Sequence, residues 1–346
     1  MISDPLDYGA FLPFVRDNET FVLTTHVNPD GDALGSEIGF AEWLLSLGKS
    51  VRIVNHSPTP YNYTFLDRPD PLVQQFDENV HTAIVQNADV IFVLDVNDAD
   101  RTRSLATLLE QSRHPVIVID HHLNPKPFAT HYLIDTEACS TGELIMRLIA
   151  YAKPILGGEI SKKAATALYV AIMTDTGSFR FPRTTAAVFR MCADLIELGS
   201  DPVMTYNEIY NTSPPGRLHL IRDSLTSLEY HYDGRVAVQA VQQSQLKAAN
   251  ALEEDVDGLV QLPFQVKGVV LSVFLLELKE GWKVSARSKD NVSAARLAQS
   301  FGGNGHFHAA GARVKPGPSF GDMIQKIVEN AGTVLAEANA LTPEPA

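Results

Sequence analysis

Residues 90–94 read Val-Ile-Phe-Val-Leu and residues 116–119 read Val-Ile-Val-Ile. Short, wholly apolar runs of this kind are typical of strands that are buried on both faces of a sheet. Segment 103–110, between the two runs, has the apolar spacing of a helix. Earlier segments alternate in the same way between strand-like and helix-like patterns: 21–25, 33–47 and 49–54. This order predicts a parallel α/β sheet with flanking helices.

The pattern changes in the second half of the chain. Two helices are expected at 141–151 and 161–174, and the segments after residue 235 become β-rich, with glycines at some of the turns. A glycine-rich run, FGGNGHFHAAGA at 301–312, precedes a helix expected at 320–337. We therefore expect three parts: an N-terminal domain over 1–204, a connector over 205–230 and a smaller α/β domain over 231–346.

Composition limits the classes of function. The chain has 346 residues, of which 45% are apolar and 20% charged, so it can bury a sizeable core. Lys and Arg number 28 against 41 Asp and Glu, a net charge of -13, which disfavours a protein that coats long nucleic acid. A small phosphorylated substrate stays compatible, because local cations or metal ions override the global field.

Two further observations concern the compartment. Two cysteines exclude a disulfide-rich scaffold and a cysteine-based zinc site. The N-terminal segment has acidic residues where a signal peptide carries Lys or Arg, and no run reaches about 18 apolar residues. A cytoplasmic enzyme with no membrane partner is therefore expected.

Three chemically active side chains follow the first predicted strand directly: His26, Asp30 and Asp32, in the run HVNPDGD. A loop can aim all three at one point, and imidazole with carboxylates suits Mn²⁺, Fe²⁺, Co²⁺ or Zn²⁺. The alternative is a simple turn in which Asp30 caps the following helix.

Acidic and imidazole side chains also follow later elements. Asp95 comes directly after 90–94, and for it a solvated loop is the alternative interpretation. Asp120, His121 and His122 follow 116–119, and a buried core position would explain one histidine but not two neighbours that point in different directions. Asp175 ends a helix-like stretch, where a carboxylate is unfavourable unless a cation compensates.

These groups are expected at one edge of the sheet, because ligands of open α/β sheets bind beyond the carboxyl ends of the strands. So many carboxylates in a small volume would repel one another and stay partly protonated. Two divalent cations remove this repulsion, and a pair about 3.5–4 Å apart can activate a water and clamp a phosphoryl group. The pattern therefore predicts metal-dependent phosphoester hydrolysis.

Four segments, in this order, resemble the motifs of the DHH phosphoesterase family: HVNPDGDALGS (26–36), DVNDADR (95–101), DHH (120–122) and MTDTGSF (173–179). The segment GGNGHFHAAG (302–311) resembles the glycine-rich signature of the family's DHHA1 domain. The resemblance extends over about 21–314 and is greatest to bacterial nanoRNase and 3′-phosphoadenosine-5′-phosphate (pAp) phosphatase enzymes. It implies an α/β fold with an N-terminal parallel-sheet DHH domain and a smaller C-terminal DHHA1 domain.

At the matching positions, the resemblance implies two divalent metal ions, with Mn²⁺ as the expected metal. The implied ligands are His26, Asp30 and Asp95 for one ion, and Asp32, Asp95, His121 and Asp175 for the other. Asp95 would therefore bridge the two ions. His122 would stabilise charge on the phosphoryl group or give a proton to the leaving oxygen, and Asp120 would orient an adjacent histidine.

The resemblance also implies that the C-terminal domain binds the rest of the substrate. The expected residues are Arg287, Ser288, Gly302, Gly303, Gly305, His306 and His308. The glycines would let the backbone approach a phosphate and expose N–H groups, with a plain β-turn as the alternative. Asn304 stands where close relatives tend to carry a fourth glycine, and Asn tolerates left-handed φ.

The expected function is 3′→5′ hydrolysis of very short oligonucleotides, linear dinucleotides included, with removal of the 3′-phosphate of pAp to give AMP as a second activity. Short RNA or DNA, or a mononucleotide bisphosphate, is thus the expected substrate. Long duplex nucleic acid is not expected as a partner, and the resemblance leaves a homodimer open. The alternatives are a cyclic-dinucleotide phosphodiesterase of the same family and a non-catalytic nucleotide-binding sensor, which the intact motifs disfavour.

Overall fold

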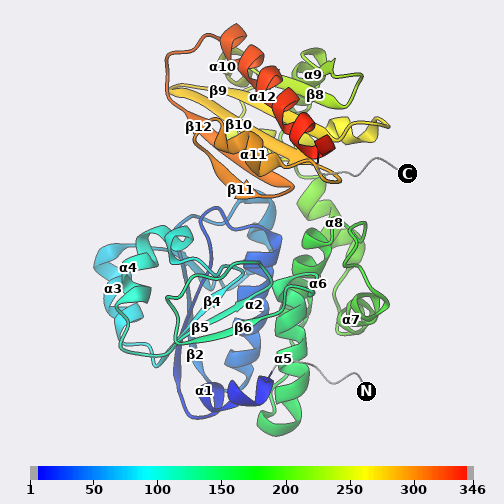
Figure 1. Cartoon of the computed structure of the whole chain (residues 1–346). Coiled ribbons are helices and arrows are strands. Elements are labelled where there is room, and N and C mark those ends of the chain that lie inside the picture. Colours follow the sequence, from blue (N-terminus) through cyan, green and yellow to red (C-terminus); the bar gives the residue numbers. More distant parts are fainter. Residues whose placement is uncertain (1–6, 341–346) are drawn as a thin grey trace. The chain divides into compact units, whose positions relative to one another are not determined.

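The computed structural model describes residues 7–340, which form two compact units, one up to Thr212 and one from Ser213 (Figure 1). Each unit is built on a six-stranded sheet, parallel in the first unit and mixed in the second. These sheets confirm the α/β class. The domain limits 1–204 and 231–346 stay a prediction, and two helices, α8 (Pro202–Tyr210) and α9 (Pro215–Thr226), occupy most of the expected connector. Within the described residues, none of the helices has the length and apolar character needed to cross a bilayer.

The first sheet has the order β3-β2-β1-β4-β5-β6, with all neighbours parallel. Its strands are β1 (Thr20–Thr24), β2 (Ser50–Asn55), β3 (Val73–Gln75), β4 (Val90–Leu94), β5 (Val116–Asp120) and β6 (His131–Ile134). The other helices of this unit are η1 (Tyr8–Ala10), α1 (Leu12–Arg16), α2 (Gly31–Ser46), η2 (Tyr61–Asp67), α3 (Glu78–Gln86), η3 (Ala99–Leu105), α4 (Ala106–Glu110), α5 (Thr141–Leu156), α6 (Lys162–Asp175) and α7 (Ala186–Glu197).

All five residues of β4 and the first four of β5 are apolar because helices cover both faces of the sheet (Figure 1). Phe92 and Leu94 of β4 pack toward α2, α5 and α6, whereas Ile91 and Val93 pack toward α3 and α4. Full burial of one such side chain contributes about 1.5–3 kcal/mol. This two-sided burial explains why β4 and β5 have no polar alternation and confirms the prediction made from 90–94 and 116–119.

Helices α2 and α6 pack at unusually short range. Three glycines spaced four residues apart on α2 face α6: Gly31, Gly35 and Gly39. A Cβ atom on Gly35 would lie 2.3 Å from the carbonyl oxygen of Ala167, so no larger side chain fits without movement of a helix. This packing brings the start of α2 and the end of α6 together beside the carboxyl ends of β1 and β4.

The strand order reverses between β1 and β4, since β2 and β3 lie on one side of β1 while β5 and β6 lie beyond β4. A crevice at the carboxyl ends of the strands forms at such a reversal and is where open α/β sheets bind ligands. Five of the six predicted metal ligands follow β1, β4 or β5 and therefore converge at this point, and the sixth, Asp175, ends α6.

One predicted helix begins later than expected. The sequence predicts a helix over 103–110, but the α-helix α4 spans only Ala106–Glu110 and follows the 3₁₀ helix η3. Arg103 has φ of 54° and ψ of -105°, which is outside the helical region and ends any continuous helix at this residue.

The second sheet has the order β11-β12-β10-β9-β8-β7, and only β8 and β9 pair in parallel. Its strands are β7 (Glu229–His231), β8 (Val236–Val241), β9 (Leu271–Leu278), β10 (Gly281–Ser288), β11 (Asn304–His306) and β12 (Ala309–Val314). The remaining helices are α10 (Gln243–Ala248), η4 (Glu253–Val256), η5 (Leu259–Gln265), α11 (Ala294–Gln299) and α12 (Phe320–Ala340). Helices α11 and α12 cover one face, and α9 with η4 and η5 covers the other.

Candidate metal centre

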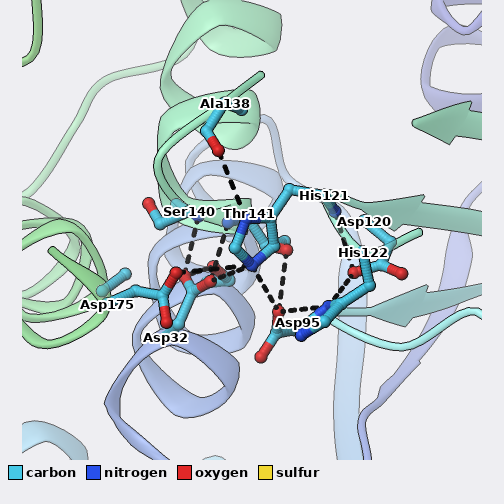
Figure 2. A network of polar contacts seen from close by, with 12 residues as sticks. Asp32, Asp95, Asp120, His121, His122, Ala138, Ser140, Thr141 and Asp175 are labelled. Carbon is cyan, nitrogen blue, oxygen red and sulfur yellow. Dashed lines mark hydrogen bonds and ion pairs between the residues drawn. The ribbon is translucent and has the colours of Figure 1, made fainter. Parts of the chain in front are cut away.

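Six carboxylate and imidazole side chains predicted as metal ligands converge at the carboxyl edge of the first sheet. They form two groups that each fit one cation: a first group of His26, Asp30 and Asp95, and a second group of Asp32, His121 and Asp175. Within each group the potential ligand atoms lie within 4.8 Å of one another. Figure 2 shows Asp32, Asp95, His121 and Asp175 pointing toward a common centre.

Asp95 links the two groups, because each of its two oxygens faces a histidine of a different group. Oδ2 lies 3.4 Å from Nε2 of His26, and Oδ1 lies 3.5 Å from Nε2 of His121. Asp95 is also one of the residues with positive φ, at 59°. A non-glycine residue in this region costs about 1–3 kcal/mol, and such strain concentrates at functional sites.

The ring of His121 has one nitrogen occupied and one without a hydrogen-bond partner. Nδ1 lies 3.3 Å from the carbonyl oxygen of Ala138, to which it can only donate, so in the neutral ring Nε2 carries the lone pair. Nε2 is buried without a hydrogen bond, and it lies 3.5–3.6 Å from oxygens of Asp32, Asp95 and Asp175. These distances exceed those of hydrogen bonds, but two atoms that bind one ion at about 2.1 Å lie roughly 3–3.5 Å apart.

The electrostatics of the site also favour bound cations. Burial and the neighbouring carboxylates of Asp95 and Asp175 raise the pKa of Asp32 well above its usual range. Burial likewise raises the pKa of Asp175 to about 6. For His121, burial lowers the pKa, but the carboxylates around it outweigh burial and raise the pKa to about 10. The raised pKa values of Asp32 and His121 indicate that the second group binds protons when no cation is present, and a metal ion would replace them.

His26 has the same arrangement as His121. Its Nδ1 lies 3.0 Å from the carbonyl oxygen of Val27, which leaves Nε2 directed at Asp95. Burial lowers the pKa of His26, but Asp95 and Asp30 raise it to about 9. Nitrogen and oxygen donors of this kind suit divalent cations such as Mn²⁺ or Zn²⁺, so the residues present fit a two-cation site.

His122 and Asp120 lie beside the two groups, and together with Asp95 and His121 their potential ligand atoms also lie within 4.8 Å of one another. Nδ1 of His122 lies 2.7 Å from Oδ1 of Asp120, which is fully buried, so the carboxylate orients this ring. Burial lowers the pKa of His122, but the hydrogen bond to Asp120 and the charge of Asp95 outweigh it, and the pKa is raised. The structure brings the two side chains into contact, and the orienting role of Asp120 and the chemical role of His122 stay predictions.

The sequence does not predict the part played by the start of α5. Backbone and side-chain donors of Thr141 and Gly142 contact Asp32 and Asp95, and neither residue is acidic or imidazole. The run Ser140-Thr-Gly-Glu143 nevertheless indicates a helix start, because Ser followed three residues later by Glu is typical of helix N-termini. Ser140 is indeed the N-cap and accepts a hydrogen bond from the backbone N–H of Glu143.

The predicted substrate-binding residues lie in the second unit, on β10, β11 and the adjoining turns. Ser288 Oγ lies 3.2 Å from Nδ1 of His308. Arg287 is partly buried and donates to the carbonyl oxygen of Ala286, and within residues 7–340 it has no carboxylate at ion-pair distance. The side chain of His306 lies outside the described part of the structure. Substrate binding by these residues stays a prediction.

The three glycines of the predicted phosphate loop do not have free N–H groups. Gly302 and Gly303 donate to carbonyl oxygens of α11, and Gly305 donates to the side chain of Asn304. A Cβ atom on Gly303 would lie 2.2 Å from the carbonyl oxygen of Gly311, so close packing on β12 requires glycine here. The prediction of exposed N–H groups is therefore not met, and any contact with a phosphate would depend on the small size of the loop.

Comparison with known proteins defines the family. Residues 20–172 match the DHH family, N-terminal domain, and residues 233–337 match the DHHA1 domain. A Thermus thermophilus protein named bifunctional oligoribonuclease and PAP phosphatase NrnA is 31% identical over 319 residues, 92% of this chain and 91% of the relative. The chain belongs to the DHH family.

Two further relatives agree with this membership. A Bacillus subtilis protein of the same name is 27% identical, and the alignment covers 86% of this DHH protein and 90% of the relative. The crystal structure of an exopolyphosphatase-related protein from Bacteroides fragilis has a TM-score of 0.89 at 28% identity, over 96% of both chains. The protein is thus a DHH-family phosphoesterase, and its buried aspartates and histidines are consistent with the divalent metal sites of that family.

Proposed function

We propose that this DHH phosphoesterase hydrolyses very short oligonucleotides from the 3′ end, linear dinucleotides included, and removes the 3′-phosphate of pAp to give AMP. Two divalent cations, Mn²⁺ by preference, would be held by the first and second groups with Asp95 between them. The observation that carries the proposal is the position of Asp95, whose Oδ2 faces His26 and whose Oδ1 faces His121.

The chemistry divides between the cations and this chain. Bound cations would supply an activated water and neutralise charge on the phosphoryl group. Asp120 accepts from Nδ1 of His122 and so turns Nε2 of that ring away from its own carboxylate. When both ring nitrogens carry hydrogen, His122 can give the Nε2 proton to the leaving oxygen, which is general acid catalysis.

Three observations support short nucleotides as the substrate class. The relatives from Thermus thermophilus and Bacillus subtilis are named as oligoribonucleases and PAP phosphatases and match over most of their length. A net charge of -13 disfavours an extended basic groove, which tracking a long single strand requires. A partly buried Arg287 without a carboxylate partner in the described residues is suited to one phosphate of a small substrate.

The test is parallel turnover of pAp, an RNA series from the dinucleotide upward, a cyclic dinucleotide and inorganic polyphosphate, with Mn²⁺ present. We expect AMP from pAp, mononucleotides from linear dinucleotides, and rates that fall as the RNA lengthens. Preferential cleavage of the cyclic dinucleotide would instead support the cyclic-dinucleotide phosphodiesterase. Nucleotide binding by Mn²⁺-loaded protein without cleavage would support the sensor.

Metal removal provides the matched control for every substrate. Dialysis against a chelator should abolish turnover, because without cations no metal-activated water is available, and added Mn²⁺ should restore it. Undiminished turnover in metal-free protein would refute the proposal for all substrates together.

A further inference from the structure

A segment of five residues, 138–142, contacts three of the six candidate metal ligands without supplying a ligand itself. It runs into the first turn of α5, and its members Ala138, Thr141 and Gly142 are buried. Figure 2 shows Ala138, Ser140 and Thr141 beside His121, Asp32 and Asp95. The three ligands contacted come from different elements, namely α2 and the ends of β4 and β5.

Both oxygens of Asp32 are held by the start of α5. The backbone N–H of Thr141 donates to Oδ2 at 2.7 Å, and the backbone N–H of Gly142 donates to Oδ1 at 2.9 Å. Ser36, one turn further along α2, also donates to Oδ1, at 3.1 Å. N–H groups in the first turn of a helix have no partner within the helix, so a carboxylate is a favourable acceptor there.

The same segment reaches the other two ligands. The hydroxyl of Thr141 lies 3.1 Å from Oδ1 of Asp95, the oxygen that faces His121, and Thr141 donates this bond because the carboxylate can only accept. The carbonyl oxygen of Ala138 accepts from Nδ1 of His121, which directs Nε2 toward the second group. One short segment thus sets the orientation of all three ligands and also the tautomer of His121.

We propose that Thr141 is a positioning residue that sets the affinity of the cation site formed by Asp32, Asp95, His121 and Asp175. The inference rests on the proposed two-cation function. The Thr141 hydroxyl holds Oδ1 of Asp95 at the second group and leaves Oδ2 directed at His26 of the first group. Loss of the hydroxyl therefore weakens the second cation position more than the first.

The test is to add Mn²⁺ to metal-free protein and to measure its binding by calorimetry and by electron paramagnetic resonance. Thr141→Val replaces the hydroxyl by a methyl group of the same size and keeps the backbone N–H that holds Asp32. We expect one Mn²⁺ to bind as in the wild type and the second to bind about 10–100-fold more weakly, as is typical when a partner of a metal ligand is removed. The spectrum of two coupled Mn²⁺ ions should give way to that of one isolated ion.

Three further variants separate positioning from folding. Thr141→Ser keeps the hydroxyl and should bind two Mn²⁺ ions within about threefold of wild-type affinity. Thr141→Ala removes the hydroxyl without adding a methyl group, so it decides the matter if Thr141→Val folds poorly. Thr166→Val removes a buried threonine hydroxyl that bonds only to the carbonyl oxygen of Lys162 in α6, and it should bind both ions normally.

Each outcome has one meaning. Two Mn²⁺ ions bound with wild-type affinity by folded Thr141→Val, or failure of Thr141→Val and Thr141→Ala alike to fold without metal, would overturn the positioning role. Wild-type protein that binds fewer than two ions would instead refute the proposed two-cation function. Rescue by Thr141→Ser together with loss of the coupled spectrum in Thr141→Val is the result that the geometry predicts.

Discussion

Asp95 carries the largest share of the proposed chemistry of any single residue. It follows β4 directly, it is buried, and its two oxygens face imidazoles of different groups. The sequence predicts its position because a polar residue at the end of a buried parallel strand must lie at the binding edge of the sheet. Its left-handed backbone could not be predicted, since nothing local in DVNDAD requires it.

Asp95→Asn should abolish metal-dependent turnover while the fold persists. The substitution keeps the shape of the side chain, and Asn tolerates positive φ, so the strained backbone can remain. Removal of a residue that only hydrogen-bonds to a metal ligand typically lowers metal affinity or activity about 10–100-fold. Loss of a ligand shared by two cations should therefore lower kcat by at least about 100-fold. Steady-state kinetics at saturating Mn²⁺ measures this loss.

Asp100→Asn is the matched control for charge, since Asp100 is an exposed acid of η3, five residues after Asp95, and within the described residues it pairs with Lys126 alone. It should retain wild-type turnover. An Asp95→Asn enzyme with more than a tenth of wild-type kcat would argue that Asp95 does not bridge two cations.

Glu37 of α2 makes the stability of the protein depend on pH. It is fully buried, Oε2 accepts a hydrogen bond from Asn55 at 2.8 Å, and Oε1 has no partner. Burial raises its pKa to about 8 from an ordinary value of 4.5. The folded protein therefore holds a proton that the unfolded chain releases above pH 4.5, so stability falls as pH rises from there to about 8.

Glu37→Gln should remove this dependence, because an amide does not titrate. Between pH 6 and pH 8 the wild type should lose about 1 kcal/mol of stability per pH unit relative to the variant. Urea unfolding of metal-free protein at each pH measures the difference. Parallel stability curves for the two proteins would show that Glu37 is ionised in the fold.

Thr141 illustrates what the residue pattern could not reveal. Aspartates and histidines after strands indicate a metal site, and the family resemblance implies the six candidate ligands, including Asp175 at the end of a helix. The segment 138–142 acts largely through backbone N–H and C=O groups, which every residue except proline carries, so its composition gives no such signal. Only the tertiary position of α5 assigns it a role.

At the scale of elements, the contact between α2 and α6 holds the second group together. Asp32 lies in the first turn of α2 and Asp175 is the last residue of α6. Helical spacing predicts both helices, but their separation is set by Gly35, whose missing side chain admits the Ala167 carbonyl oxygen. Close approach of this kind is a property of two helices together, so single-segment patterns do not indicate it.

Gly35→Ala should destabilise the protein and weaken metal binding together. Its Cβ atom would lie 2.3 Å from a backbone oxygen, so one helix must move, at a cost of about 1–3 kcal/mol or more. That movement also separates Asp32 from Asp175. Thermal unfolding with and without Mn²⁺ measures both effects.

Gly321→Ala is the control, because Gly321 is exposed at the start of α12, where the nearest atom to an added Cβ is 3.9 Å away. That variant should keep its unfolding temperature and its stabilisation by Mn²⁺. Wild-type stability of Gly35→Ala would mean that α2 and α6 are not packed as closely as described.

The whole molecule divides the proposed work between its two units. The candidate ligands lie in the first unit, whereas the predicted substrate-binding residues lie in the second. The α/β class, the parallel sheet and the β-rich second half all follow from the sequence, since burial patterns of whole strands are strong signals. The role of the glycine loop could not be predicted from the sequence, because close packing on a neighbouring strand and phosphate binding both require glycine.

Arg287→Gln should raise KM for a linear dinucleotide roughly tenfold or more while kcat changes less, because a charge-assisted hydrogen bond contributes about 1.5–3 kcal/mol. Arg296→Gln, in the same unit, removes an exposed arginine that pairs with Glu337 and should leave both constants unchanged. A loss confined to kcat in Arg287→Gln would move this residue from substrate binding to the chemical step.

The central claim is that two cations share Asp95 at the carboxyl edge of the first sheet. The most direct test is a crystal structure of Mn²⁺-soaked protein, with anomalous scattering recorded at the manganese edge. The account predicts two peaks about 3.5–4 Å apart, one beside His26 and one beside His121, with a carboxylate oxygen of Asp95 bound to each. A single peak, or two peaks that do not both contact Asp95, would contradict it.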